Sequence, residues 1–181
     1  MAKLVSKTYG EALFELAVEE GREEELLAEI QQLKELLSEN PDFGRLMNHP
    51  KILKEEKLEV LEKVFKGRIS EELLGFLYLI VNKDRYGDID DILDYFIGEV
   101  KQLKGIGIAH VATATAISED KKKEIEERLL ATTSFSKMEM HYHVEEDLIG
   151  GMVIRIGDRV VDSSVKTKLD QLQRQLLKVQ L

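Results

Sequence analysis

The stretch best equipped for chemistry lies near the C-terminal end, in LIGGMVIRIGDRVVDSSVKTKL, residues 148–169. Paired glycines and clusters of aspartate and serine are typical of phosphate-binding loops and of serine nucleophiles. The residues concerned are Gly150, Gly151, Gly157, Asp158, Asp162 and Ser164. No phosphate-loop or dinucleotide-binding pattern is present, and the glycine pair precedes a predicted strand, not a helix. The pair therefore predicts a turn or bulge where two backbone segments approach closely.

The aspartate–serine cluster does not fit a nucleophile site either. A nucleophile elbow has the pattern G-x-S-x-G, which is absent here, and no histidine follows Ser164. The cluster lies at a predicted strand-to-helix transition, where a side-chain oxygen accepts hydrogen bonds from the first helical N–H groups. We therefore expect Ser163 or Ser164 to cap a helix, which stabilises it by about 1 kcal/mol. We expect no catalytic residue in this stretch.

Two histidines, His141 and His143, alternate along a predicted strand and share one face of it. With Glu145 they could form the metal site of a hydrolase, and this enzyme hypothesis stays open as one alternative. A zinc site needs three or four ligands, and no HExxH motif is present. The acidic run DRYGDIDDILD, residues 84–94, lacks the spacing of a calcium loop. We therefore expect no metal and no cofactor, which metal analysis of the purified protein would test.

Composition excludes several classes of function. The 181 residues carry a net charge of −9. They include no cysteine, and this absence excludes disulfides, thiol nucleophiles and cysteine-bound metals. Nucleic-acid binding needs many basic contacts to phosphate, so we expect no nucleic-acid partner. The longest apolar run is LLGFLYLIV, residues 73–81, whereas a membrane span needs about twenty apolar residues. We expect a cytoplasmic protein without direct membrane insertion.

The first hundred residues read as consecutive amphipathic helices. Helices are predicted over 3–20 and 23–37, in a short segment from Pro41, over 53–65, after a cap at Ser70, and from a cap at Asp88 to about residue 104. From residue 105 glycines and β-branched residues indicate strands. One alternating strand carries Met138, Met140, Tyr142 and Val144 on one face, and Gly157–Asp158 marks a tight hairpin turn. Ser118 and Ser163 or Ser164 begin the two remaining helices.

These elements predict an α+β protein with two domains. An N-terminal six-helix bundle would span residues 1–104, with net charge −8, and a small mixed α/β domain would span 105–181, with net charge −1. Helix 73–81 is apolar nearly all round, and the first helix carries Phe14 and Val18 on the side away from Tyr9. Either these second apolar sides are buried in the bundle, or they form a groove for a partner helix.

At the level of motifs, the chain resembles the δ subunit family of bacterial ATP synthases, equivalent to the mitochondrial oligomycin-sensitivity-conferring protein. The resemblance runs from end to end. It includes the opening helix YGEALFELAVEEG, the segment NHPKILKEEK with Pro50, Ile52 and Lys57, and Arg85. The most specific block is L-I-G-G…I-G-D…D-x-S-V…L, from Leu148 to Leu169, in which Ser163 replaces the family's glycine.

The resemblance implies a non-catalytic stator subunit, present in one copy per complex at the cytoplasmic face of the cell membrane. It would couple ion-driven rotation to ATP synthesis. N-terminal helices of the α subunits would bind a groove that involves Tyr9, Ala12, Leu13, Leu77 and Leu79. C-terminal ends of the b subunits would contact Val165, Leu169, Leu172 and Leu176. The glycine block would be scaffold. The alternative is a generic helical adaptor with another partner.

Overall fold

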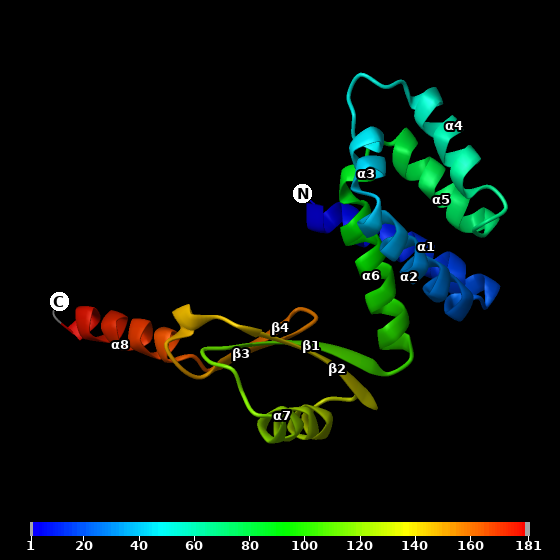
Figure 1. Cartoon of the computed structure of the whole chain (residues 1–181). Coiled ribbons are helices and arrows are strands. Elements are labelled where there is room, and N and C mark those ends of the chain that lie inside the picture. Colours follow the sequence, from blue (N-terminus) through cyan, green and yellow to red (C-terminus); the bar gives the residue numbers. More distant parts are fainter. Residues whose placement is uncertain (1, 180–181) are drawn as a thin grey trace. The chain divides into compact units, whose positions relative to one another are not determined.

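Figure 1 shows a computed structural model of the chain, which describes residues 2–179 and the side chains of residues 4–177. The chain divides into two compact units, with the division between Val100 and Lys101. The described residues form eight α-helices and one small four-stranded mixed sheet. The predicted α+β class is therefore confirmed.

Six helices make up most of the N-terminal unit. They are α1 (Ala2–Glu20), α2 (Glu23–Glu39), α3 (Pro41–Met47), α4 (Lys54–Phe65), α5 (Glu71–Asn82) and α6 (Ile89–Leu103), with a 3-10 turn η1 (Tyr86–Asp88) before α6. The long helices begin and end within two residues of their predicted bounds, because strong local signals fix them. Gly21 has a φ of +65° after α1, and Pro41 is the first residue of α3.

The two predicted caps of this unit differ in outcome. Ser70 caps α5: its hydroxyl accepts from the Leu73 N–H at 3.4 Å and donates to the Glu29 carboxylate at 2.6 Å. Asp88 was predicted to cap the sixth helix, but it is the last residue of η1, which leads directly into α6. Its carboxylate lies 3.7 Å from the Arg85 guanidinium. Here a 3-10 turn, as is frequent at helix ends, precedes the helix.

One hydrophobic core unites the N-terminal unit. Every one of its six helices contributes buried side chains, and Tyr86 of η1 joins them. Its largest fully buried members include Phe96, Leu13, Leu26, Ile30, Leu73 and Leu77. The amphipathic stripes seen in the sequence therefore face one another, and burial of their apolar area is the main stabilisation of this unit.

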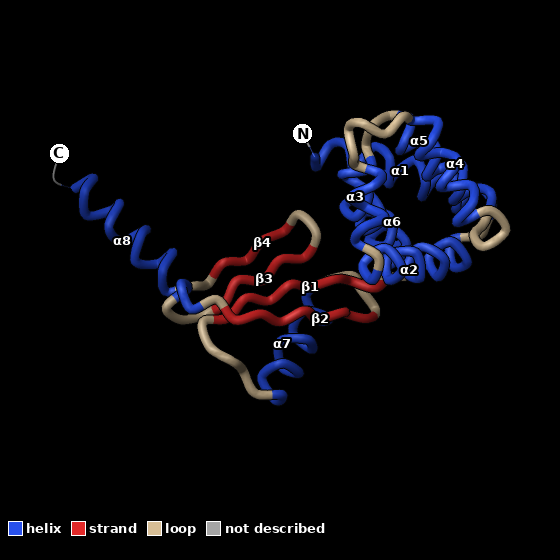
Figure 2. Tube along the Cα trace, turned by 45° about the horizontal axis from the view of Figure 1, so that its top comes forward, coloured by secondary structure: helices blue, strands red, loops and turns tan. Residues whose placement is uncertain are grey.

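The C-terminal unit is built on the sheet β2-β1-β3-β4 (Figure 2). Its elements are β1 (Ile106–Thr113), α7 (Glu119–Thr132), β2 (Lys137–Val144), a 3-10 turn η2 (Glu146–Leu148), β3 (Met152–Ile156), β4 (Arg159–Asp162) and α8 (Val165–Val179). Strands β1 and β2 are parallel and α7 connects them, whereas β3 pairs antiparallel with both β1 and β4. Ser118 caps α7 as predicted, since its hydroxyl accepts from the Lys121 N–H.

The two faces of this sheet differ. Helix α7 covers the face that carries Met138 and Tyr142, and the Tyr142 hydroxyl donates to the Lys122 carbonyl at 3.1 Å. The opposite face carries a row formed by His141, His110 and Arg155, which are paired across β2, β1 and β3. The predicted hairpin is confirmed, because Ile156 pairs with Arg159 and only Gly157 and Asp158 lie between them. A φ of +55° at Gly157 is the backbone that such a turn requires.

Candidate partner-binding surfaces

The glycine pair touches the serine cluster thirteen residues further along the chain. Gly151 has a φ of +77°, and a Cβ added there would lie 2.5 Å from the Ser163 carbonyl oxygen. A Cβ on Gly150 would lie 3.0 Å from a Val165 methyl group, and the Gly150 carbonyl accepts from the Val165 N–H at 2.9 Å. The predicted close approach of two backbone segments is therefore confirmed. Both ends of the motif meet at the first residue of α8.

A polar network then starts α8. The Ser164 hydroxyl accepts from the Thr167 N–H at 3.2 Å, which makes Ser164 the cap. Asp162 accepts from the Ser164 N–H at 2.8 Å and from the Thr167 hydroxyl at 2.7 Å. Hydrogen bonds from Ser164 and Thr167 hold the pKa of Asp162 below its usual value. These polar groups therefore anchor a helix, and Asp158 lies apart from them in the hairpin turn.

Beyond its first turn α8 has little contact with the rest of its unit. Thr167 is half-buried, whereas every other described side chain of α8 is exposed. The four predicted stalk contacts Val165, Leu169, Leu172 and Leu176 are 37% to 70% exposed. They are therefore surface residues of this chain and not part of its core. An exposed row of apolar side chains is the kind of feature that protein-binding surfaces present.

The predicted contacts on α1 and α5 divide into two groups. Leu13 and Leu77 are 2% and 1% exposed and belong to the core of the N-terminal unit. Ala12 is exposed, Tyr9 is half-buried and Leu79 is 42% exposed. Both leucines are part of the chain's own core, and the groove for a partner stays a prediction.

One residue that matters on α1 was missed by the sequence analysis. Gly10 is buried, and a Cβ there would lie 2.7 Å from the Tyr95 ring and 3.0 Å from the Ile92 carbonyl oxygen. This glycine lets α1 approach α6 closely. A glycine inside a helix is unfavourable by itself. Its place in an otherwise regular helix was the signal that could have revealed this contact.

The proposed metal ligands do not converge. His141 donates a hydrogen bond to the Glu139 carboxylate at 3.0 Å, and its ring stacks on that of His110 with 5.0 Å between the ring centres. His143 lies 4.0 Å from the Glu145 carboxylate. Within the described part of the chain, no group of three or more histidine, aspartate or glutamate side chains is arranged to hold a metal ion. The side chains of this face instead form ion pairs and ring contacts.

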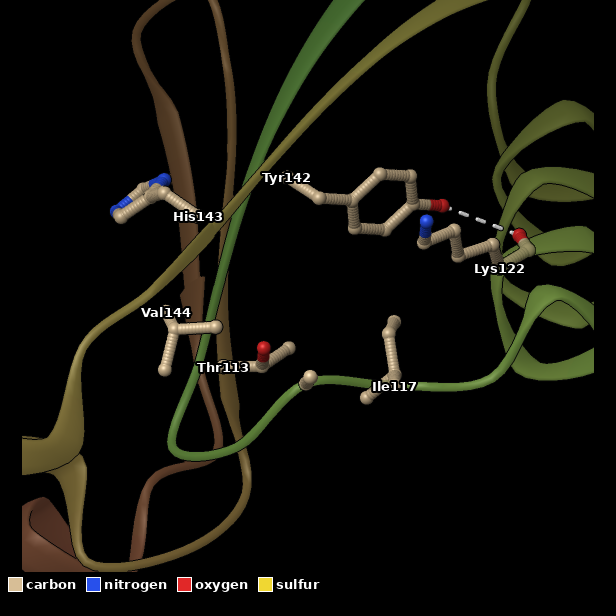
Figure 3. Close-up of a pocket in the computed structure, with 7 residues that line it drawn as sticks. Thr113, Ile117, Lys122, Tyr142, His143 and Val144 are labelled. Atoms are coloured by element: carbon tan, nitrogen blue, oxygen red, sulfur yellow. Dashed lines mark hydrogen bonds between the residues drawn. The ribbon is translucent and has the colours of Figure 1, made fainter.

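A pocket of about 190 Å³ lies at the carboxyl ends of β1 and β2 (Figure 3). Its walls include Thr113, Ile117, Tyr142 and Val144, and the Lys122 ammonium lies 5.3 Å from the centre of the Tyr142 ring. That ammonium also pairs with Glu119 at 2.6 Å. The lining is therefore largely apolar with one paired cation, an arrangement that suits packing better than acid–base chemistry.

A unit with a full core, followed by a unit that exposes an apolar helix, is the architecture of a protein-binding adaptor. Across residues 2–179, no helix has both the length and the apolar character required to cross a membrane. The model of the family "ATP synthase delta (OSCP) subunit" matches residues 5–176. The chain therefore belongs to this family, and it is a peripheral-stalk subunit of an ATP synthase.

Individual relatives agree with this assignment. The chain is 50% identical to ATP synthase subunit delta of Lachnoclostridium phytofermentans over 181 residues, which is all of both chains. It is 34% identical over 173 residues to that of Alkalihalophilus pseudofirmus, covering 96% of this chain and 95% of the relative. The fold is also similar to a chain in the cryo-EM structure of the Toxoplasma gondii mitochondrial ATP synthase hexamer. That likeness has a TM-score of 0.75 and 22% identity, and covers 95% of this chain and 97% of the other.

Proposed function

We propose that this chain is the non-catalytic link between the catalytic head and the peripheral stalk of an ATP synthase. The N-terminal six-helix bundle, residues 1–104, binds the N-terminal helices of the α subunits. The C-terminal domain, residues 105–181, binds the C-terminal ends of the b subunits. One copy serves each complex at the cytoplasmic face of the cell membrane, and no cofactor takes part.

The exposed stripe of α8 is the observation that carries this proposal. Leu169, Leu172 and Leu176 stand in water in the isolated chain. Burial of one such side chain against a partner contributes about 1.5–3 kcal/mol. Together with membership of the family, this surface supports a contact with the stalk. Val165 continues the stripe to the point where the glycine motif anchors the helix.

On the head side, the exposed members of the predicted groove carry the contact. Ala12 and Leu79 supply surface on α1 and α5, and half-buried Tyr9 supplies an aromatic edge with a polar tip. Leu13 and Leu77 act indirectly, because they fix both helices on the shared core. Arg85, which follows α5, pairs with Asp88 and so stabilises the turn at the end of this surface.

A stator subunit must hold both partners under torque, so slow dissociation is the physical requirement. A dissociation constant of about 1 nM corresponds to roughly −12 kcal/mol. An interface of standard size, about 1,600 Å² in total, supplies such affinity when a few anchors are well buried. Helix-in-groove binding provides anchors of this kind.

The test is calorimetric titration of the full chain with a peptide of the N-terminal segment of the cognate α subunit. We expect one-to-one binding by the wild type and a loss of at least about tenfold for Leu79→Glu, the size expected for one lost anchor. Leu36→Glu is the matched control, since Leu36 is an exposed leucine of α2. Absence of binding by the folded wild type, or equal loss in both variants, would contradict the head-binding proposal.

A further inference from the structure

Four exposed apolar residues of α8 follow a regular spacing, and a fifth, Leu177, lies beside them at a b position. Val165, Leu169, Leu172 and Leu176 are separated by four, three and four residues, and all are exposed. This 3.5-residue period is that of the a and d positions of a left-handed coiled coil. We infer that α8 is one strand of a two-stranded coiled coil whose other strand is a single acidic amphipathic helix of the stalk. The inference rests on the proposed stalk function and specifies its partner.

The attachment of α8 to its own unit leaves this seam free. Thr167, the half-buried residue of α8, lies at the f position, opposite the a and d positions. Its hydroxyl and N–H bond Asp162 and Ser164 on the far side of the helix, whereas at the start of the seam Val165 lies against Gly150. Docking of a second helix on the seam therefore displaces none of these bonds.

The charge of α8 selects the partner. Residues 165–179 contain four basic residues and one acidic residue, net +3, whereas the rest of the chain carries −12. The positions that flank the seam, e and g, hold Lys166, Lys168, Gln173 and Gln175, and the single acidic residue, Asp170, lies at b. Flanking residues form the interhelical ion pairs that choose partners in coiled coils. An acidic helix complements these flanks.

A second copy of this chain fits the seam less well. Pairing of two α8 helices would bring lysine and glutamine flanks together, without any acidic flanking residue to form an ion pair. Fifteen residues are also marginal for an isolated helix in water. Docking of an acidic helix should therefore raise the helicity of the end of α8 as well as bury its leucines.

A strained residue extends the seam at its first turn. Ile149 has a φ of +65° and is 65% exposed, although a β-branched residue disfavours that backbone. It directly precedes Gly150, whose carbonyl bonds the Val165 N–H. Its ψ of −39° lies outside the left-handed helical region that asparagine tolerates, so glycine, which has no Cβ, would adopt this backbone more easily. An exposed isoleucine at a strained position, one residue before the glycine that contacts Val165, suits a partner contact at the start of the seam.

The probe is a peptide of the C-terminal 40 residues of the cognate b subunit, titrated into the full chain. We expect Leu172→Glu to weaken binding at least about 30-fold, because it places a charge in the seam. Gln171→Glu adds the same charge at the c position and should change affinity less than about twofold. Gln175→Glu should weaken binding about threefold at low salt, and this difference should shrink in 0.5 M NaCl.

Substitution of Ile149 should change two measured properties in opposite directions, stability upward and peptide affinity downward. Ile149→Gly should raise the midpoint of thermal unfolding by relieving the backbone, and should lower affinity for the peptide about fivefold or more. Ile149→Val keeps the β-branch and most of the apolar surface, so both properties should stay near the wild type. A fall in stability without a fall in affinity would remove Ile149 from the seam.

The outcomes separate the inference from the function beneath it. If the wild type binds the peptide and neither Leu172→Glu nor Gln171→Glu weakens that binding, the coiled-coil seam is wrong and stalk binding remains. Failure of the folded wild type to bind the peptide would overturn the stalk proposal itself. A concentration-dependent dimer of the chain in sedimentation, abolished by Leu172→Glu, would assign the seam to a second copy and overturn the acidic partner.

Discussion

The two units of this chain differ in how they place their apolar residues: the first buries most of them and the second exposes many. The N-terminal unit gathers buried side chains from all six helices and η1 into one core. The smaller C-terminal unit buries a few residues between α7 and the sheet and a small cluster around Leu148. Of the large exposed apolar side chains among residues 4–177, five lie before Val100 and ten after it. The first unit buries most of its apolar side chains in its own core, whereas the second exposes many of them.

The same substitution in each unit tests this contrast, and it carries the largest expected effect. Leu93→Ala removes a fully buried side chain of α6 and should lower the free energy of unfolding by about 2–5 kcal/mol. Leu172→Ala removes an exposed side chain of α8 and should change it by less than about 0.5 kcal/mol. Urea unfolding followed by circular dichroism measures both. A large loss for Leu172→Ala would place that leucine in a core of the free chain.

Local patterns predicted most of the fold. Gly21, Pro41 and the caps Ser70 and Ser118 mark helix ends because capping and turn chemistry depend on residues close in sequence. The contact between the glycine pair and the serine cluster was predicted only as a close approach of backbones. Which segments would meet depends on the sheet order, which no local pattern encodes.

The candidate head-binding surface was harder to predict, for a physical reason. Periodicity finds the apolar side of α1, but the same stripe describes a helix that faces its own core and one that faces a partner. Leu13 lies on the core side and Ala12, one residue earlier, is exposed. On α5, apolar residues surround the helix, so Leu77 and Leu79 could not be separated without the structure. On the last helix the same ambiguity held, because its leucines could equally have been domain core, and only the structure places them at the surface.

Backbone strain in the glycine motif allows a second test within the C-terminal unit. Gly151→Ala places a Cβ 2.5 Å from the Ser163 carbonyl oxygen at a φ of +77°. We expect a loss of about 2 kcal/mol or more, because left-handed backbone and a backbone clash add together. Gly157→Ala is the matched control: its φ is +55°, but nothing lies within 4 Å of the added Cβ. It should lose only about 1 kcal/mol, the backbone term alone.

Hydrogen exchange locates these two losses. Faster exchange in Gly151→Ala should appear in β3 and α8, while α1 to α6 keep the protection of the wild type. Equal losses in Gly151→Ala and Gly157→Ala would show that the contact with Ser163 relaxes without penalty. The glycine pair would then act only through its backbone conformation.

Two glycines on different helices of the N-terminal unit, Gly10 on α1 and Gly98 on α6, test helix packing. Gly10→Ala should destabilise by about 1–3 kcal/mol, because the added methyl overpacks the contact with Tyr95 and the Ile92 carbonyl. Gly98→Ala, inside α6 with nothing within 4 Å, should stabilise by up to about 1 kcal/mol through helix propensity. The midpoints of thermal unfolding of both variants, compared with the wild type, measure these two changes in stability. Stabilisation by Gly10→Ala would mean that α1 and α6 separate easily.

The smallest expected effect is a dependence of stability on pH, and it arises on the sheet face that carries His141, His110 and Arg155. Burial lowers the pKa of His110 from its ordinary 6.5, and nearby His141, His143 and Arg155 lower it further, while Glu139 opposes them. The unfolded chain therefore binds a proton at His110 more readily than the folded chain does. The stability associated with His110 is complete above about pH 6.5 and declines as the pH falls through the lowered pKa.

His110→Gln should therefore flatten the stability profile below pH 6.5 and leave it unchanged above that value. Arg155→Gln should produce part of the same effect, because it removes one of the positive charges that disfavour the protonated ring. His49→Gln, in the N-terminal unit, controls for the type of substitution. Urea midpoints between pH 5 and 8 measure all three. A profile for His110→Gln that still falls like the wild type would assign the acid sensitivity to other groups. It would also leave the stacked His110–His141 pair as a neutral surface contact, because a ring that destabilises the fold on protonation must change the profile when it is replaced.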